Sequence, residues 1–246
     1  MSGWLALNQR IFYWLFAAPL RGQRWSISET FHQMILIGVR ALPMSALVAL
    51  SIGLTLAMQS AGEMRKLGAD AYVPDLVSVS LLRELGPLLI AVIVIGRSGS
   101  SVTAELGTMK VGEEIEALEV MAINPIRFLV IPRVLAMLMM LPVLTVFGDC
   151  IGIAGGWIIC TSTLDFNTPS YIIRAMDRAQ PWDLFSGLIK SVVFAWIIIT
   201  ISCQRGLEVE GGAEGVGQAT TQAVVWSILM MLIANAALTG MFFFMG

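Results

Sequence analysis

Long apolar segments alternate with short polar ones along the chain. Five of the apolar segments contain few charges and are long enough for a helix to cross about 30 Å of hydrocarbon. They span residues 41–62, 76–96, 128–164, 184–203 and about 223–244. The pattern predicts an all-α polytopic membrane protein with five transmembrane helices.

The third segment is the longest, and at about 1.5 Å per residue it exceeds the thickness of one bilayer. Arg133, Pro142 and Asp149 interrupt it. Dividing it at Asp149 would leave a second piece of about 15 residues, which is shorter than membrane-spanning helices usually are. We therefore expect a single helix that tilts, kinks or extends beyond the bilayer.

Residues 1–40 precede the first span. The part from Trp4 to Leu20 mixes aromatic and aliphatic residues with Asn and Arg, and no small-residue cleavage site follows a short apolar core. This composition is typical of an uncleaved amphipathic helix at the membrane surface. We expect residues 1–246 to form one domain, with residues 1–40 interfacial and residues 41–246 in the membrane part.

The Lys and Arg residues predict the orientation, because cytoplasmic loops carry an excess of them. An odd number of spans places the two termini on opposite sides. Nine basic residues then fall on the N-terminal side and four on the other. The nine are Arg10, Arg21, Arg24, Arg40, Arg97, Lys110, Arg127, Arg133 and Arg205, and the four are Arg65, Lys66, Arg174 and Arg178. We expect a cytoplasmic N-terminus and an outside, periplasmic C-terminus, in an inner or plasma membrane.

Composition narrows the possible chemistry. Of the 246 residues, 57% are apolar and 13% are charged, which excludes a disordered or fibrous protein and argues against a soluble one. A net charge of −2 does not suggest binding to nucleic acid. Three cysteines without CxxC spacing and the single His32 predict no metal site. Residues 204–222 are glycine-rich, but no lysine follows a glycine, so the chain has no Walker A loop. Any coupling to ATP must therefore come from another subunit.

The connection over residues 97–127 contains a short amphipathic pattern that predicts a helix over about residues 111–123. The apolar stripe consists of Val111, Ile115, Leu118 and Ala122, with Glu113, Glu116 and Glu119 on the remaining surface. Asn124 and Pro125 then end the helix. The spacing alone favours a helix resting on the membrane. The alternative is a docking helix that transmits movement from a cytoplasmic partner.

Charged residues also fall inside the predicted spans, where they normally face a cavity or a partner. Arg83 precedes Arg97 by 14 residues and Lys190 precedes Arg205 by 15, so both lie about 21 to 23 Å from the inner boundary. Glu84 belongs to the same layer. Two cations and one anion leave a positive charge that suits an anionic head group in an outward-open cavity. The alternative is an ion pair that only joins the second and fourth helices.

Two features of the third span leave alternatives open. Asp149 is a looser member of the charged layer, since it could cap a kink or face the outer water. Gly148, Gly152 and Gly156 form a doubled GxxxG pattern, which permits close helix approach. That pattern fits packing within the chain and homodimerisation equally well.

Two blocks of sequence resemble a known family. They read RELGPLLIAVIVIGRSGSSVTAELGTMKVGEEIEALEVMAINPIRFLVIPRVLAMLMMLPVLT from Arg83, and GLIKSVVFAWIIITISCQRGLEVEGGAEGVGQATTQAVV from Gly187. Together they resemble the signatures of the MlaE/YrbE permeases, the membrane subunits of MCE-type lipid ABC transporters. The blocks cover well over a third of the chain and occur in the family's order.

The resemblance implies a homodimeric permease subunit that moves glycerophospholipids between the inner membrane and an outer-facing hexamer of MCE-domain protein, which maintains outer-membrane lipid asymmetry. It implies no cofactor in this chain, with ATP and Mg bound by a cytoplasmic ABC ATPase and with a possible STAS-domain regulator. The chain itself would not be an enzyme.

The resemblance also assigns residues. The family's coupling helix falls on residues 113–121, so it implies ATPase coupling through Glu113, Glu116, Leu118 and Glu119. Its charged cavity residues map onto Arg83, Glu84 and Lys190 as a substrate-binding set. Many members carry an acidic residue in the last span, where this chain has Asn235 between Ala234 and Ala236. Asn235 is therefore assigned to the substrate site, with an altered charge balance.

Two rival functions remain. An intramembrane enzyme acting on lipids would need a nucleophile and a base, and His32 is remote from the charged layer, so no catalytic residue is assigned. A passive scaffold or channel that anchors a partner complex without ATP-coupled transport is the stronger alternative. Co-purification of the chain without any ATPase would favour it.

Overall fold

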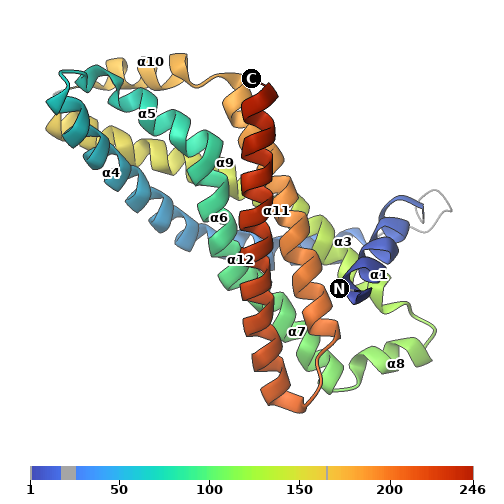
Figure 1. The fold of residues 1–246 in the computed structure, drawn as a ribbon. Coiled ribbons are helices and arrows are strands. Elements are labelled where there is room, and N and C mark those ends of the chain that lie inside the picture. The colour runs from blue at the N-terminus through green and yellow to red at the C-terminus, as the bar shows by residue number, and fades with distance from the viewer. Residues whose placement is uncertain (1, 18–25, 165, 246) are drawn as a thin grey trace. The chain divides into compact units, whose positions relative to one another are not determined.

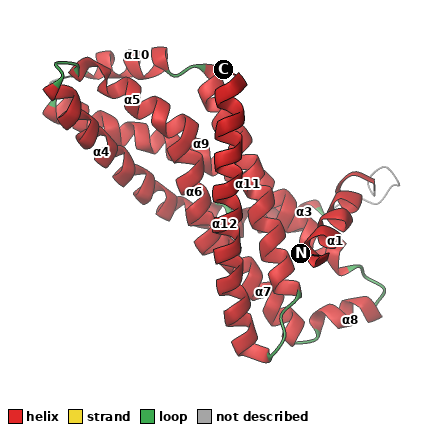
Figure 2. Cartoon of the chain, viewed as in Figure 1, coloured by secondary structure: helices red, strands yellow, loops and turns green. Residues whose placement is uncertain are grey.

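The computed structural model describes residues 2–17, 26–164 and 166–245, and all regular elements in these ranges are helices (Figures 1 and 2). Five helical stretches are long and apolar enough to cross a membrane, which confirms the predicted number of spans. They are Ile27–Lys66, Asp70–Val111, Ile126–Thr163, Pro181–Leu207 and Gly212–Phe244. Arg21, Arg24 and the end of the predicted interfacial segment, residues 18–20, lie outside the described residues.

The chain forms two compact units, and each of the five helical stretches contributes residues to both. The first unit lies within Met1–Ala41, Val92–Met140 and Val193–Phe243. The second lies within Leu42–Ala91, Leu141–Val192 and Phe244–Gly246. Each unit is described by itself below.

The first unit brings the N-terminal helices together with one end of several spans. It contains α1 (Ser2–Phe12), α3 (Ile27–Ile37), α7 (Ser100–Val111), α8 (Glu114–Val120) and nearly all of α12 (Gly212–Met245). Ile11 of α1 is fully buried, and the indole of Trp4 donates a hydrogen bond of 3.2 Å to Thr200 Oγ1 on α11 (Pro181–Leu207). At the start of α3, the Ser26 hydroxyl accepts from the Glu29 amide and so caps the helix.

In the second unit, small residues allow helices to approach closely. It contains α4 (Leu42–Lys66), α5 (Val73–Ser80), α10 (Thr168–Arg178) and the second part of α9 (Ile131–Thr163). Gly53 of α4 faces the backbone of Gly152 on α9, where no Cβ would fit. A Cβ on Gly155 would lie 2.7 Å from the Leu50 carbonyl oxygen. The glycine pattern of the third span is therefore used for packing within the chain.

The continuity of the third span is confirmed, and the glycine-rich connection is shorter than predicted. The third span is one continuous helix, α9, with Pro142 inside it. The glycine-rich connection is reduced to residues 208–211, because α11 continues to Leu207 and α12 begins at Gly212. Pro74 lies in the first turn of α5, a position where a missing N–H costs nothing.

The predicted helix over residues 111–123 is wrong at both ends. Val111 belongs to α7, and α8 covers only Glu114–Val120. Glu113 and Ala122 have φ of 58°, a left-handed conformation that interrupts a helix, and they bound α8 on its two sides. Asn124 then starts the next helical segment, since its side-chain oxygen accepts from the amides of Ile126 and Arg127. An apolar stripe alone could not show these breaks.

The short helix α10 (Thr168–Arg178) was not predicted from the pattern of apolar residues. Asn167 caps this helix by accepting from the Ser170 amide, and Tyr171 on its inner face is buried and donates a hydrogen bond of 2.9 Å to the Ile153 carbonyl. Burial raises the pKa of the Tyr171 hydroxyl above its ordinary value. The helix packs on α5, and both belong to a core that includes Val73, Val77 and Cys160.

Candidate functional site

A π-helical turn, η4 (Leu81–Leu85), carries Arg83 and Glu84 between α5 and α6 (Gly86–Val94). Pro87 explains it. Proline has no N–H, and its ring clashes with the carbonyl of the residue four positions earlier, which is Arg83. The Gly86 amide donates instead to Leu81, five residues back, as in a π-helix. The Arg83 carbonyl therefore needs a partner from outside its own helix.

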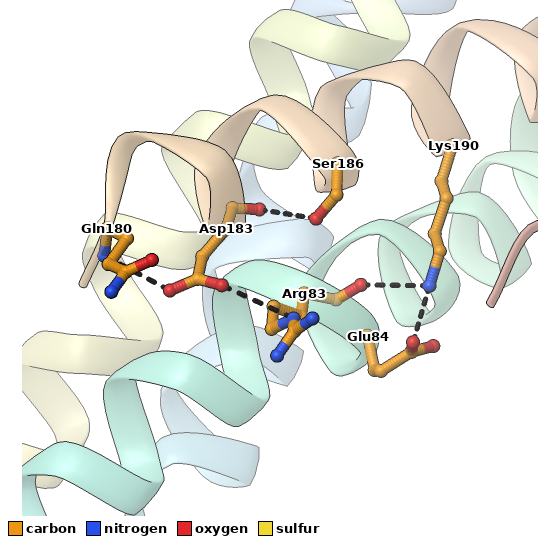
Figure 3. Close-up of polar contacts among 6 residues, drawn as sticks. All are labelled: Arg83, Glu84, Gln180, Asp183, Ser186 and Lys190. Carbon is orange, nitrogen blue, oxygen red and sulfur yellow. Dashed lines mark hydrogen bonds and ion pairs between the residues drawn. The ribbon is translucent and has the colours of Figure 1, made fainter. Parts of the chain in front are cut away.

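Lys190 on α11 supplies that partner (Figure 3). Its ammonium donates a hydrogen bond of 3.1 Å to the Arg83 carbonyl and forms an ion pair with the Glu84 carboxylate. The Lys190 side chain is only 2% exposed, whereas that of Glu84 is 38% exposed. A buried ammonium needs such partners, because leaving it without them would cost several kcal/mol.

Arg83 pairs with a residue that the sequence analysis did not single out. Its Nε lies 3.2 Å from Oδ1 of Asp183, whose side chain is 9% exposed (Figure 3). Asp183 lies in the first turn of α11, two residues after Pro181, and its other oxygen accepts from the Gln180 amide at 3.1 Å. An acidic residue in a first turn interacts favourably with the helix dipole. The Pro-Trp-Asp run could have indicated this position.

Asp183 corrects the predicted charge balance. Residue spacing predicted two cations and one anion, but the described cluster contains Arg83 and Lys190 together with Glu84 and Asp183. The prediction of a surplus positive charge is therefore wrong for this cluster. The shared depth of Lys190 and Glu84, in contrast, is confirmed by their contact.

The cluster has one buried side and one open side. Lys190 and Asp183 are buried, while the Arg83 side chain is 44% exposed. Arg83 uses Nε for Asp183, and its two terminal amino groups donate no hydrogen bond to the described part of the chain. A guanidinium held at one edge and open at the other can bind a phosphate oxygen pair without new folding of the site.

Backbone contacts hold the π-turn in place. Gly187 of α11 faces the Leu82 carbonyl so closely that a Cβ would collide with it. On another side, a Cβ on Gly86 would collide with Oδ1 of Asp149 on α9. Asp149 is 2% exposed, so it does not face the outer water, and its Oδ1 has no hydrogen-bond partner within residues 2–17, 26–164 and 166–245. The turn is therefore fixed by α9 and α11 together.

The second candidate region is α8, in the first unit. Lys110 at the end of α7 forms an ion pair with Glu116, and this hydrogen bond lowers the pKa of the Glu116 carboxyl below its usual range. Ile115 is buried, Leu118 is half-buried, and Glu113 and Glu119 are exposed. The helix thus presents an acidic surface from a fixed position.

A pocket of about 390 Å³ adjoins α8. It lies between α1, α8 and the end of α11, and its lining includes Leu7, Arg10, Ile115, Glu119 and Glu208. All of these residues belong to the first unit. Its walls combine apolar side chains with charges of both signs, so it can receive an amphipathic segment.

The chain matches a known protein family over most of its length. The family model described as "Permease MlaE" matches residues 30–241. The chain belongs to the MlaE permease family. The match includes the charged cluster and α8, whereas α1, which lines part of the pocket beside α8, precedes the matched residues.

Named relatives of this MlaE family permease come from bacteria and plants. A probable ABC transporter permease protein of Rickettsia prowazekii is 42% identical over 217 residues, 88% of this chain and 84% of that protein. The intermembrane phospholipid transport system permease protein MlaE of Haemophilus influenzae is 36% identical over 213 residues, 86% of this chain and 81% of that protein. The chloroplastic protein trigalactosyldiacylglycerol 1 of Arabidopsis thaliana is 35% identical over 215 residues, 87% of this chain and 61% of that protein.

In this MlaE permease, Asn235 lies in α12 and is half-buried. It belongs to the first unit, whereas the charged cluster belongs to the second. Its assignment to the substrate site stays a prediction. So do the binding role of Arg83, Glu84 and Lys190 and the coupling role of the acidic residues on α8.

Proposed function

We propose that this chain is the membrane permease subunit of an ABC-type transporter that moves glycerophospholipids between the inner membrane and an outer-facing partner. The observation that carries the proposal is the half-open ionic cluster at membrane depth, with Arg83 fixed by Asp183 and still exposed. Ionisable groups inside a membrane domain are costly and mark a substrate path. The Haemophilus relative, a permease of an intermembrane phospholipid transport system, supports the same substrate class.

Each residue of the cluster has a distinct part in the proposed binding step. Arg83 contacts the lipid phosphate with its terminal amino groups, while Asp183 orients the guanidinium. Lys190 fixes the π-turn through the Arg83 carbonyl, and its charge is compensated by Glu84. The acyl chains lie against aliphatic and Met side chains. Asn235, in the first unit, is proposed separately as a polar uncharged contact for the lipid.

The energy comes from outside this chain in the proposal. A cytoplasmic ABC ATPase binds ATP and Mg and docks on α8 through Glu113, Glu116, Leu118 and Glu119. The ion pair between Lys110 and Glu116 supports this step, because it links α8 directly to α7 and lets a push on one helix reach the other. The chain itself hydrolyses nothing.

The assembly follows from the same proposal. Two copies form a homodimer, a hexamer of MCE-domain protein continues the lipid path outside, and a STAS-domain protein regulates the ATPase. The N-terminus lies in the cytoplasm and the C-terminus in the periplasm. In a cell with two membranes, the transporter maintains the lipid asymmetry of the outer one.

The test is ATP-driven transfer of a fluorescent phosphatidylethanolamine by the purified complex in phosphatidylcholine vesicles. Arg83→Gln should lower transfer about tenfold, since a charge-assisted hydrogen bond contributes about 1.5 to 3 kcal/mol. Asp183→Asn should keep transfer within about twofold, because the asparagine oxygen can still accept from Arg83 Nε and orient the guanidinium, which stays charged and exposed. Arg65→Gln, an exposed arginine at the end of α4, is the matched control and should change nothing.

Four results would contradict the proposal. Normal transfer by Arg83→Gln would remove the phosphate contact. Equal loss in Arg83→Gln and Asp183→Asn would show that their ion pair is only structural. Purification of the chain with no ATPase, or transfer that ignores ATP, would favour a passive scaffold or channel.

A further inference from the structure

A carboxyl group without a partner is buried beside the π-turn, in the second unit. Asp149 lies within the third membrane span and is 2% exposed. In the described part of the chain, its Oδ1 atom accepts no hydrogen bond and its carboxyl group forms no ion pair. A polar group buried in this way points to a bound ligand or to a change in its charge.

The polar groups nearest to Asp149 along α9 are bonded elsewhere. One turn before it, the Thr145 hydroxyl donates to a backbone carbonyl of its own helix. One turn after it, the Ile153 carbonyl accepts the hydrogen bond from Tyr171 of α10. Arg133, the basic residue of α9, is paired with an acidic residue on α7. The helix that carries Asp149 therefore offers it no counter-charge.

The elements around this part of α9 offer no counter-charge either. α4 has no charged residue before its last four residues. η4 and α11 carry Arg83, Glu84, Asp183 and Lys190, but these four form two ion pairs with one another (Figure 3). Two cations and two anions leave this cluster balanced. An ionised Asp149 would therefore add a buried negative charge without compensation, which is costly.

The position of the carboxyl group connects it to the π-turn. Oδ1 of Asp149 lies directly against Gly86, in the place that a Cβ on this glycine would take. Gly86 is the residue whose amide donates to the Leu81 carbonyl and so closes the π-turn. A neutral carboxyl group can pack on this backbone without a counter-ion, whereas a carboxylate would have to move toward water or a cation.

We propose that Asp149 is a proton-binding site whose occupancy controls the π-turn. The carboxyl group holds a proton while it packs on Gly86, and release of the proton moves the group away and frees η4 to shift. Arg83 and Glu84 lie on the same turn, so the proton then controls how the charged cluster is presented to a head group. Only this last step rests on the proposed function. Ionisable residues inside membrane spans serve as proton sites in many pumps and transporters.

A proton fits these observations better than a metal ion or a buried water molecule. A metal ion takes several ligands from the protein, and no group of three His, Cys, Asp or Glu side chains that could hold one occurs among the residues that the structure describes. A water molecule needs room beside Oδ1 and further polar partners. The Gly86 backbone lies against that atom, so a proton is the ligand that needs no additional space.

The first measurement is infrared difference spectroscopy of the purified complex in phosphatidylcholine vesicles, between neutral and alkaline pH. A protonated carboxyl group without a hydrogen bond has a carbonyl band distinct from the bands of carboxylates. Wild type should show this band at neutral pH and lose it at alkaline pH. Asp149→Asn, which has the shape of the neutral acid, should lack the band. Asp177→Asn, which removes an exposed carboxyl group from α10, is the matched control and should keep it.

The second measurement is the amount of lipid transferred per ATP hydrolysed over the same pH range. This ratio removes the pH dependence of the ATPase itself. In wild type the ratio should fall as the infrared band disappears, because the ionised Asp149 no longer holds η4 in place. In Asp149→Asn the ratio should show no fall over this pH step, since the asparagine side chain cannot lose a proton.

The two measurements separate the possible failures. Absence of the band from wild type at neutral pH, or its persistence in Asp149→Asn, would overturn the proton site. The same pH profile of transfer in both proteins would overturn the control of η4. If wild type transfers no lipid at any pH, the proposed function fails, and the band still decides on the proton site. If Asp149→Asn does not assemble, the pH titration of the band in wild type decides.

Discussion

At the scale of single residues, burial decides what the two ion pairs of the charged cluster contribute. Lys190 is buried, so its pairing with Glu84 compensates a charge that water does not solvate. Arg83 is paired through one edge only and keeps solvent contact. The first pair is therefore chiefly structural, and the second leaves a group available for a ligand.

The free-energy cost of the buried Lys190 charge can be measured from the stability of two variants. Glu84→Gln removes the carboxylate charge and leaves the Lys190 ammonium buried, which should destabilise the protein by about 3 kcal/mol or more. Lys190→Met removes the buried charge itself, and the exposed Glu84 carboxylate can be solvated by water. This variant should therefore destabilise the protein clearly less than Glu84→Gln. Thermal unfolding of the purified variants in one detergent checks the order. Equal losses, or a larger loss for Lys190→Met, would show that the Lys190 charge is not the dominant cost.

At the scale of helices, the packing of α4 on α9 depends on a residue with no side chain. Gly53 meets the Gly152 backbone directly, whereas nothing lies within 4 Å of a Cβ placed on Gly62 of the same helix. Backbone cannot move aside as a flexible side chain can. Gly53 and Gly62 are therefore matched test positions. Both lie inside α4 and have the same helix propensity, but only Gly53 packs against another helix.

Gly53→Ala should lower stability by about 1 to 3 kcal/mol, because the added methyl group separates the two helices. Gly62→Ala should be neutral or slightly stabilising, since alanine favours a helix by about 1 kcal/mol over glycine. The unfolding temperatures of the two variants in detergent provide the comparison. A stable Gly53→Ala protein would mean that α4 is free to shift against α9.

At the scale of the whole molecule, hydropathy was sufficient to predict the number of spans and the continuity of α9, because both depend on long apolar runs. It could not predict α10, which is too short and too polar to resemble a span. It also placed the start of the fourth span at residue 184, one residue after Asp183. That boundary is why the second carboxylate of the cluster was missed.

Local backbone geometry could not be predicted from the apolar pattern either. Charge spacing brought Lys190 and Glu84 to one depth, but the partner of Arg83 depended on a π-turn that no apolar periodicity reports. At α8, the apolar stripe predicted a longer helix because it carries no information on left-handed residues such as Glu113. Element type was thus predictable, and the places where a helix breaks or widens were not.

The five spans predict opposite locations for the two chain ends. A phosphatase that is active only outside the cytoplasm should be active when fused after Met245 and inactive when fused before Ser2. A fluorescent protein that folds only in the cytoplasm should give the reverse pattern. Activity of both fusions with the same reporter would mean that one of the five helices does not cross.

The π-turn at Leu81–Leu85 has a consequence for how the second span can change. One residue inserted without a full extra turn rotates everything beyond it by about 100° about the helix axis. The segments before and after η4 are thus out of phase, and Arg83 and Glu84 stand at the step between them. The second span can therefore accept many substitutions before and after η4, but an insertion or deletion within η4 would change this rotation. Single-residue gaps in related sequences should avoid Leu81–Leu85.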